Sequence, residues 1–256
     1  FANVLSSPNN ILGIEYLKSL KRQKSKIKPI TIKREGSKYN DTKIPRGSRF
    51  ASATAIRNLC QSTDDITPLQ KFIPETTFDI LEENIKKGNF EKNLSTFDKE
   101  IIYTLRKMST DEIANLPDVS EGLEFALKSA ANQCNSVIEL LSIIKTKRYT
   151  QTRLQRILLY AILGVTKKDI ELSIATPIPY IRVLGFNDKG QELLSEIAKK
   201  NKKLEVITSV KKFMDKKGQD NLKLLMDKDI WATDVYTLGF EYESKANLDY
   251  THKLIT

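Results

Sequence analysis

The stretch Phe50-Ala51-Ser52-Ala53-Thr54-Ala55-Ile56-Arg57 separates a basic, loop-like segment from a run with helical spacing of apolar residues. We predict a helix over residues 52–62, with the hydroxyl of Ser52 or Thr54 as its N-cap. Arg57 is unusual at this place. A cation near a helix N-terminus opposes the positive end of the helix dipole, unless an anion is also present.

Two interpretations of this helix start are open. Free backbone amides, two hydroxyls and a guanidinium at one helix N-terminus can together hold a phosphate group. The alternative is an ordinary capped helix with Arg57 in solvent. Because short motifs often occur by chance, the octapeptide alone favours the ordinary cap.

The composition is that of a soluble globular protein with room for a sizeable core. Of the 256 residues, 40% are hydrophobic and 29% are charged, and this length is typical of one large or two medium domains. No apolar run approaches the ~20 residues of a membrane helix, so we expect neither a membrane span nor a membrane partner. The start, Phe1-Ala2-Asn3-Val4, shows no Met and no signal peptide, and we expect the middle of a longer chain.

Cysteine and histidine are too scarce for most metal and nucleophile chemistry. Cys60 and Cys134 are far apart and are predicted to be buried or idle thiols in a reducing cytoplasm. His252 is the one histidine of the chain, so a His-based zinc site or a Ser-His or Cys-His catalytic group is not expected. We predict a cytoplasmic protein and identify no metal ligands.

The charge balance favours a polyanionic partner. Lysine and arginine number 42 against 32 acidic residues, which gives a net charge of +10 and a pI near 9.4. A lysine-rich surface can also serve solubility alone. The distribution of the charge therefore has to decide.

The order of predicted elements indicates an α/β remnant followed by a mostly helical region. An amphipathic helix near the N-terminus precedes residues 29–34, which alternate like a short strand. A helix followed by a strand is the end of a βαβ unit, so residues 1–62 are predicted to be the last part of a parallel-sheet domain. Residues 63–256 are predicted to be mainly helical with a few short strands, two of them at 181–186 and 204–208.

Stripes of apolar residues predict which helix faces form the core. Such stripes recur at helical spacing between residues 78 and 162. Two examples are Leu123, Leu127 and Ala130 in one helix, and Ile138, Leu141 and Ile144 in the next. We assign these stripes no functional role.

The strongest candidate for a nucleic-acid contact is the junction between two predicted helices at residues 145–156. Its cations surround one aromatic residue, and phosphate contacts beside a ring that can stack on an unpaired base suit RNA loops. Thr150 or Thr152 is the predicted N-cap of the second helix. A solvated helix junction is an equally good interpretation, because cations also complement the C-terminal dipole of the first helix. The residues in question are Lys145, Lys147, Arg148, Tyr149, Arg153 and Arg156.

Four segments share an order and spacing that run along nearly the whole chain. They are Ser7-Pro8-Asn9-Asn10-Ile11-Leu12-Gly13-Ile14-Glu15-Tyr16, Ile32-Lys33-Arg34 leading to the stretch at 50–57, Lys145-Thr146-Lys147-Arg148-Tyr149-Thr150 with Arg153-Leu154-Gln155-Arg156, and Tyr180-Ile181-Arg182-Val183-Leu184-Gly185-Phe186-Asn187-Asp188-Lys189-Gly190. Together they resemble the bacterial tRNA(Met) cytidine acetate ligases, a branch of the nucleotidyltransferase superfamily.

The resemblance implies that the first region is the end of a Rossmann-like nucleotidyltransferase domain, and it implies a two-step reaction. ATP and acetate form acetyl-adenylate with release of pyrophosphate. The acetyl group then passes to N4 of the wobble cytidine of elongator tRNA(Met). Mg²⁺ is expected with ATP, although the sequence offers no ligand set for it.

The resemblance also implies roles for single residues. Ser52, Thr54 and Arg57 match the superfamily's Ser-Ser-Thr-x-x-Arg-type motif, which holds the triphosphate and stabilises charge as pyrophosphate leaves. Given this match, we prefer the phosphate cradle over the ordinary cap. The implied ATP-binding residues are Asn9, then Asn10, and Arg34. The junction at 145–156 becomes the candidate tRNA-contacting surface.

The chain departs from the family pattern in two places. The family's His-x-Gly-His-type motif is absent, so the chain resembles the C-terminal two-thirds of the enzyme, and we expect no acetyl-adenylate from it alone. Where relatives tend to read Glu-Gly-Leu-Glu-Asn-Arg, this chain has Glu121-Gly122-Leu123-Glu124-Phe125-Ala126, which puts any role of the Asn-Arg pair in doubt. The competing hypotheses are an adenylyltransferase that makes a small-molecule or acyl adenylate without RNA, and a non-catalytic RNA-binding module.

Overall fold

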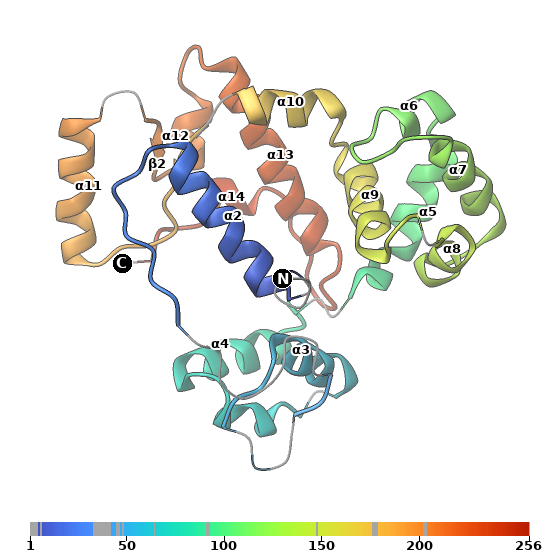
Figure 1. Ribbon diagram of the computed structural model, residues 1–256, viewed down its shortest axis with the longest axis horizontal. Coiled ribbons are helices and arrows are strands. Elements are labelled where there is room, and N and C mark those ends of the chain that lie inside the picture. The colour runs from blue at the N-terminus through green and yellow to red at the C-terminus, as the bar shows by residue number, and fades with distance from the viewer. Residues whose placement is uncertain are drawn as a thin grey trace. The chain divides into compact units, whose positions relative to one another are not determined.

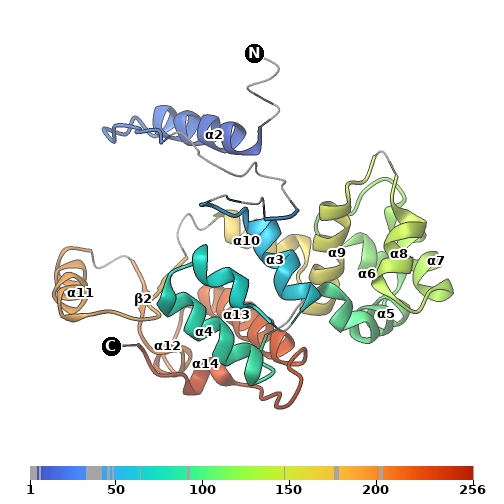
Figure 2. The same ribbon diagram turned by 90° about the horizontal axis from the view of Figure 1, so that it is seen from below.

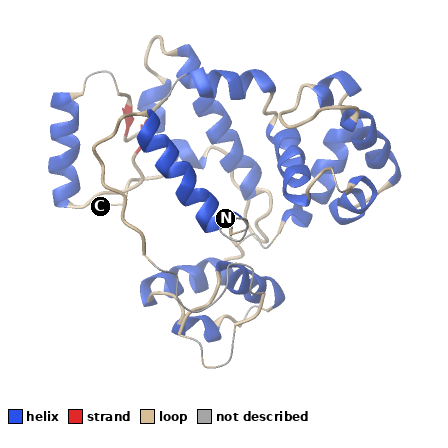
Figure 3. Cartoon of the chain, in the orientation of Figure 1, coloured by secondary structure: helices blue, strands red, loops and turns tan. Residues whose placement is uncertain are grey.

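The computed structural model describes residues 5, 7–32, 42–44, 47, 49–63, 65–90, 93–146, 148–175, 179–201 and 204–255. Contacts divide the chain into two compact units, Phe1–Glu83 and Asn84–Thr256. Helices dominate both units, and the strands among the described residues are a short pair in the second unit (Figures 1 and 3).

The first unit is helical and has a small buried core, to which α2 contributes no buried residue. The helices are α2 (Pro8–Arg22), α3 (Ala53–Ser62), η1 (Thr67–Lys71) and α4 (Glu75–Lys86), the last of which crosses the boundary in sequence. Pro8 suits the first position of α2, because its missing N–H would have no helical partner there. The buried apolar side chains are Ala55, Cys60, Ile66, Leu69 and Phe78.

The strand predicted at residues 29–34 is not formed over the part of it that the structure describes. Residues 25–32 are irregular, whereas Lys33 and Arg34 lie outside the described residues. Ile30 and Ile32 are 88% and 93% exposed. An alternating segment becomes a strand only where a neighbouring strand takes its backbone hydrogen bonds, and the described residues of this unit include no strand. The Rossmann-like remnant therefore stays a prediction.

The second unit has a large helical core in its first half. Figures 1 and 2 both show α5, α7, α8 and α9 gathered together. Their apolar faces meet in one cluster that includes Leu105, Leu127, Leu140 and Leu158, each fully buried. The elements of this half are η2 (Leu94–Phe97), α5 (Asp98–Lys107), α6 (Thr110–Ala114), α7 (Leu123–Gln133), α8 (Val137–Ile144), α9 (Gln151–Leu163) and α10 (Lys167–Ala175).

The two stripes named above, now in α7 and α8, point into this core except for one residue. Leu123, Leu127 and Ala130 are buried as predicted, whereas Ile138 is 70% exposed. The buried face of α8 consists of Val137, Leu140, Leu141 and Ile144, which is the i, i+3, i+4, i+7 set. Ile138 lies beside that face, so its assignment to the core stripe was wrong.

The second half of this unit contains a small βαβ arrangement. β1 (Ile181–Arg182) and β2 (Val206–Ile207) pair in parallel, with Ile181 opposite Val206 and Arg182 opposite Ile207. Parallel strands need a crossover connection, which α11 (Asp188–Lys200) supplies. The predicted extended runs are confirmed as much shorter strands. The remaining helices are α12 (Val210–Met214), α13 (Asp220–Thr237) and α14 (Leu248–Thr251).

Backbone and side-chain hydrogen bonds join the parts of the second unit. Trp231 and Lys228 of α13 donate to the carbonyls of Ile162 and Gly164 at the end of α9, at 3.2 and 2.6 Å. A bridge pairs Gly185 with Ile255, and a Cβ at Gly185 would lie 2.9 Å from the Ile255 carbonyl oxygen. Glycine is therefore required at this close approach.

No described helix is both long and apolar enough to cross a bilayer.

Candidate functional site

Ser52 begins α3 as its N-cap. Its Oγ accepts a hydrogen bond of 2.9 Å from the backbone N–H of Ala55, and the residue is 1% exposed. The backbone of Ser52 is extended, as is usual for a residue just outside a helix. The predicted cap at Ser52 is thereby confirmed, and the hydroxyl fixes where the helix starts.

Thr54 and Arg57 lie side by side on α3. Arg57 Nη2 donates to Thr54 Oγ1 at 3.4 Å, and the arginine is exposed. The first turn of α3 contains no acidic residue, and within the described part of the chain no carboxylate pairs with Arg57. Among the described residues, the start of α3 therefore presents a hydroxyl and a cation with no carboxylate paired to them, which is the arrangement that an anionic ligand can complete.

The other predicted nucleotide-binding residues lie on different segments. Asn9 and Asn10 are exposed in the first turn of α2. Ser7 precedes them as the N-cap residue, and its carbonyl accepts from the Asn10 N–H at 3.0 Å. Arg34 lies outside the described residues. The structure thus unites Ser52, Thr54 and Arg57 at one helix start and places the two asparagines at another.

The predicted basic junction is an ordered connection between α8 and α9. Lys145 is the C-cap residue of α8, and Thr150 is the N-cap residue of α9, although its side chain makes no capping bond. Thr146 Oγ1 accepts from the backbone N–H groups of Arg148 and Tyr149 at 3.2 and 3.3 Å. Lys147 lies outside the described residues.

The arginines of this junction contact the loop that precedes α7, and the sequence analysis did not predict this contact. Arg153 donates to the Asp118 carbonyl through Nε and Nη2 at 3.1 and 2.6 Å, and Nη2 also reaches Ser120 Oγ at 3.0 Å. Arg156 donates two hydrogen bonds to Asp118 Oδ2, and Arg148 forms an ion pair with Glu121. Two of the five predicted cations, Arg148 and Arg156, are thus paired with carboxylates of the protein, so part of the expected charge is neutralised.

Tyr149 is not placed for stacking on a base. Its side chain is 9% exposed and belongs to the helical core, and its hydroxyl lies 3.5 Å from the Ser120 carbonyl. The guanidinium groups of Arg148 and Arg153 lie 5.9 and 5.2 Å from the ring centroid. Because an aromatic ring must be exposed to stack on RNA, Tyr149 supports the junction from within.

The loop at 118–122 has several residues with left-handed backbone conformation, and Arg153 donates hydrogen bonds to its backbone. Asp118 and Glu121 have φ angles of 64° and 60°, and Gly122 has 83°. Left-handed backbone is uncommon outside glycine, although aspartate tolerates it. The sequence did contain a signal for this partner of the basic junction, because Asp118 and Glu121 lie close together just before Gly122.

The described residues contain no group of three His, Cys, Asp or Glu side chains that could hold a metal ion. The carboxylates nearest the basic junction, Asp118 and Glu121, are taken up by arginines.

Comparison with known proteins identifies relatives of the chain along nearly its whole length. A model of the HIGH nucleotidyltransferase family matches residues 1–250. The chain is 42% identical over 252 residues to the tRNA(Met) cytidine acetate ligase of Thermoanaerobacter pseudethanolicus, covering 98% of this chain and 60% of that protein. It is 39% identical over 254 residues to the enzyme of the same name from Caldanaerobacter subterraneus, covering 99% and 61%.

Solved structures agree with these matches. The apo crystal structure of Thermotoga maritima TmcAL superposes with a TM-score of 0.86 at 31% identity, over 98% of this chain and 60% of that one. The same protein bound with alpha-thio ATP superposes with a TM-score of 0.83. The chain thus spans about three-fifths of the length of the relatives it matches. It belongs to the HIGH nucleotidyltransferase family.

Proposed function

We propose that this chain is part of an ATP-dependent ligase that acetylates N4 of the wobble cytidine of elongator tRNA(Met). The observation that carries this proposal is the match to tRNA(Met) cytidine acetate ligases along 98% of the chain at 42% identity. The Thermotoga relative binds an ATP analogue, which supports ATP as the substrate. The predicted domains remain residues 1–62 for the catalytic domain and residues 63–256 for the mainly helical tRNA-contacting domain, whereas the compact units of the structure divide after Glu83.

The proposed chemistry has two steps that balance. An acetate oxygen attacks the α-phosphorus of ATP, the bond to the β-phosphate oxygen breaks, and pyrophosphate leaves. The N4 amine of cytidine then attacks the acetyl carbonyl, AMP leaves, and the amine loses a proton. Negative charge builds up on the leaving pyrophosphate, where a fixed cation is most effective.

The geometry of α3 supports a different proposed task for each of its three motif residues. Ser52 is buried and caps the helix, so it positions the turn. Thr54 and the exposed Arg57 are in contact with each other and are available to phosphate oxygens. Asn9 and Asn10 at the start of α2, together with Arg34, complete the proposed ATP-binding set.

The proposed tRNA surface is the α8–α9 junction. The Arg148 and Arg156 side chains are 61% and 53% exposed despite their ion pairs. Lys145 and Lys147 add positive charge, and Lys145 Nζ lies 3.4 Å from Gln151 Oε1. Arg153 is mainly a structural residue because it holds the Asp118 backbone. Tests of RNA binding should therefore change Lys145 and Arg148 rather than Arg153.

A fusion experiment tests the proposed reaction. The chain is joined to the part of the Thermoanaerobacter ligase that it does not match, and transfer of radiolabelled acetate to elongator tRNA(Met) is measured. We expect acetylation that requires ATP, acetate and this tRNA. Arg57→Ala should lower kcat/KM by about 100-fold, whereas Arg22→Ala, an exposed arginine of α2, should leave it unchanged.

Two outcomes favour the alternatives. A fusion that makes an adenylate but neither binds nor acetylates tRNA is an adenylyltransferase acting without RNA. A fusion that binds tRNA but makes no adenylate is an RNA-binding module.

The chain alone has one histidine and so cannot contain a His-x-Gly-His motif. We infer that it forms no acetyl-adenylate, and acetate-dependent ATP–pyrophosphate exchange by the purified chain would refute this.

A further inference from the structure

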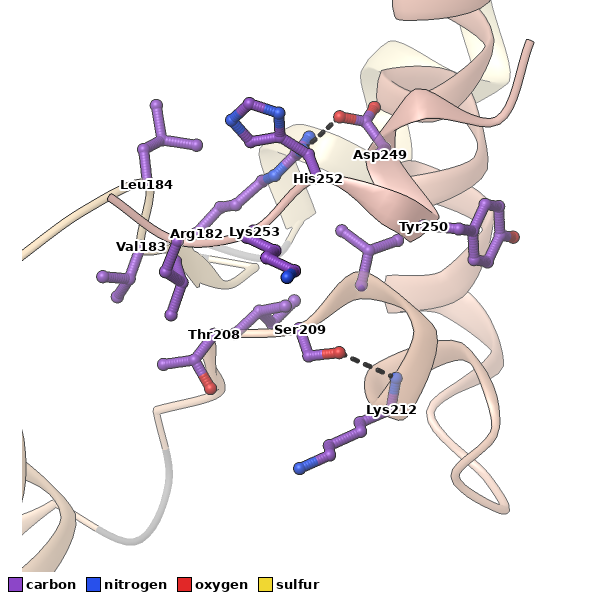
Figure 4. Close-up of a pocket in the computed structure, with 13 residues that line it drawn as sticks. Arg182, Val183, Leu184, Thr208, Ser209, Lys212, Asp249, Tyr250, His252 and Lys253 are labelled. Carbon is purple, nitrogen blue, oxygen red and sulfur yellow. Dashed lines mark hydrogen bonds and ion pairs between the residues drawn. The ribbon is translucent and has the colours of Figure 1, made fainter. Parts of the chain in front are cut away.

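A cavity of about 300 Å³ lies at the carboxyl ends of β1 and β2, and none of the residues assigned above lines it. Three chain segments line it (Figure 4). The first is residues 182–184 at the end of β1. The second is residues 207–210 with Lys212, where β2 leads into α12, and the third is residues 249–254. Ligands of parallel sheets bind at the carboxyl ends of the strands, which is where this cavity opens.

The charged side chains of the lining are mostly basic. They are Arg182, Lys212 and Lys253, with Asp249 as the one carboxylate among the lining residues, beside aliphatic residues such as Val183 and Ile207. Asp249 is 9% exposed, forms an ion pair with Arg182 and also accepts from Thr233 Oγ1 at 2.8 Å. The Asp249 charge therefore compensates Arg182, while the lysines retain an excess of positive charge. A concave surface with an excess of positive charge concentrates anions.

Backbone hydrogen bonds fix the third wall over the cavity. Phe186 N–H donates to the Ile255 carbonyl at 2.9 Å, and Ile255 N–H donates to the Leu184 carbonyl at 3.2 Å. Lys253 and His252 are thereby held next to β1. Figure 4 draws the Lys253 side chain across the middle of the lining, whereas the Tyr250 ring turns away from it. The pKa of Tyr250 is raised by burial and then by Asp227, Asp215 and Asp234, none of which lines the cavity.

We propose that this cavity binds a phosphate group of the RNA backbone through Lys212 and Lys253. The proposal rests on the proposed function, because it takes RNA as the source of the phosphate. Lysine binds phosphate as a point charge. Free phosphate offers the same chemistry, so the experiments below distinguish the two sources.

The single histidine gives a direct test of binding. Its Cε1–H resonance is observed by NMR while inorganic phosphate is added to the whole chain. We expect a saturable change in this resonance. Lys212→Gln and Lys253→Gln should each weaken phosphate binding about tenfold, the effect of one lost charged hydrogen bond. Lys211→Gln is the matched control, because Lys211 lies on the same helix, α12, but outside the lining.

Binding of elongator tRNA(Met) at several salt concentrations tests the source of the phosphate. We expect the Lys212→Gln/Lys253→Gln double variant to bind more weakly and to lose about one to two units of salt slope, with Lys211→Gln unaffected. If His252 responds to phosphate but the double variant keeps its RNA affinity, the RNA source is overturned. If the His252 resonance does not change with phosphate and the double variant binds RNA as the unmodified chain does, the site itself is overturned. If no form of the chain binds RNA, the proposed function fails, and the His252 response still reports on the cavity.

Discussion

Arg156 holds the Asp118 carboxylate by two hydrogen bonds, from Nε at 3.1 Å and from Nη2 at 2.7 Å, across 38 residues of sequence. Asp118 raises the pKa of Arg156, first through its hydrogen bonds and then through its charge. The same aspartate has a left-handed backbone with φ of 64°. The arginines of the α8–α9 junction therefore stabilise the loop before α7, and this task competes with binding an external anion.

Replacing Asp118 with asparagine should have opposite effects on stability and RNA binding. Asparagine tolerates the left-handed backbone, so the change mainly removes the charge. We expect the free energy of unfolding to fall by about 0.5–1 kcal/mol, as for a partly exposed ion pair. RNA affinity should rise and become more salt-dependent, because Arg156 is released. Urea unfolding and filter binding measure the two effects.

Asp111→Asn is the control for this experiment, because it removes the same charge from exposed α6. It should change RNA affinity less than Asp118→Asn does. Equal RNA affinities in the Asp118→Asn variant and the unmodified chain would show that this junction does not contact RNA.

Ser52→Ala should destabilise the first unit. The buried hydroxyl caps α3, and loss of such a cap costs about 1 kcal/mol. Ser62→Ala, at the exposed end of the same helix, should change stability by less than about 0.5 kcal/mol. Urea unfolding followed by circular dichroism compares them. Equal midpoints would mean that Ser52 does not set the helix start.

Adjacent leucines of α9 test the helical core. Leu158 is fully buried, whereas Leu159 is 37% exposed. Leu158→Ala should lower the free energy of unfolding by about 2–5 kcal/mol, because it removes buried methyl groups and leaves a cavity. Leu159→Ala should cost less than about 1 kcal/mol. A reversed order in thermal or urea unfolding would contradict the packing described for α9.

Asp169 should make the second unit sensitive to acid. Burial alone would raise its pKa, but hydrogen bonds from Thr166 N–H and Oγ1, at 2.7 and 2.8 Å, and the charge of Lys228 bring the pKa below its usual value. Because the folded pKa is the lower one, the stabilisation is present above the unfolded pKa near 4 and is lost as the pH falls through the folded value.

Urea unfolding between pH 6 and pH 2 measures this dependence. Asp169→Asn should flatten the loss of stability on the acid side, and Thr166→Val, which removes one hydrogen bond and keeps the carboxylate, should give an intermediate curve. Superimposable acid limbs for all three proteins would show that Asp169 does not contribute.

Local chemistry made much of this structure predictable. The Ser52 cap and the two buried free thiols follow from side-chain preferences. The failures concern distant partners. Residues 29–32 have strand composition without a strand, and Tyr149 is buried because α9 and the loop before α7 enclose it. The Asp118–Arg156 pair joins segments whose meeting depends on left-handed turns that no residue type strictly demands.

The bridge between Gly185 and Ile255 has a consequence for the order of events on the ribosome. The helical core of α5, α7, α8 and α9 is encoded in one continuous stretch and can pack as soon as that stretch has emerged. The lysine-lined cavity needs partners as distant as Arg182 and Asp249, 67 residues apart. Since synthesis is vectorial and non-local contacts form slowly, we expect this cavity to form after the helical core.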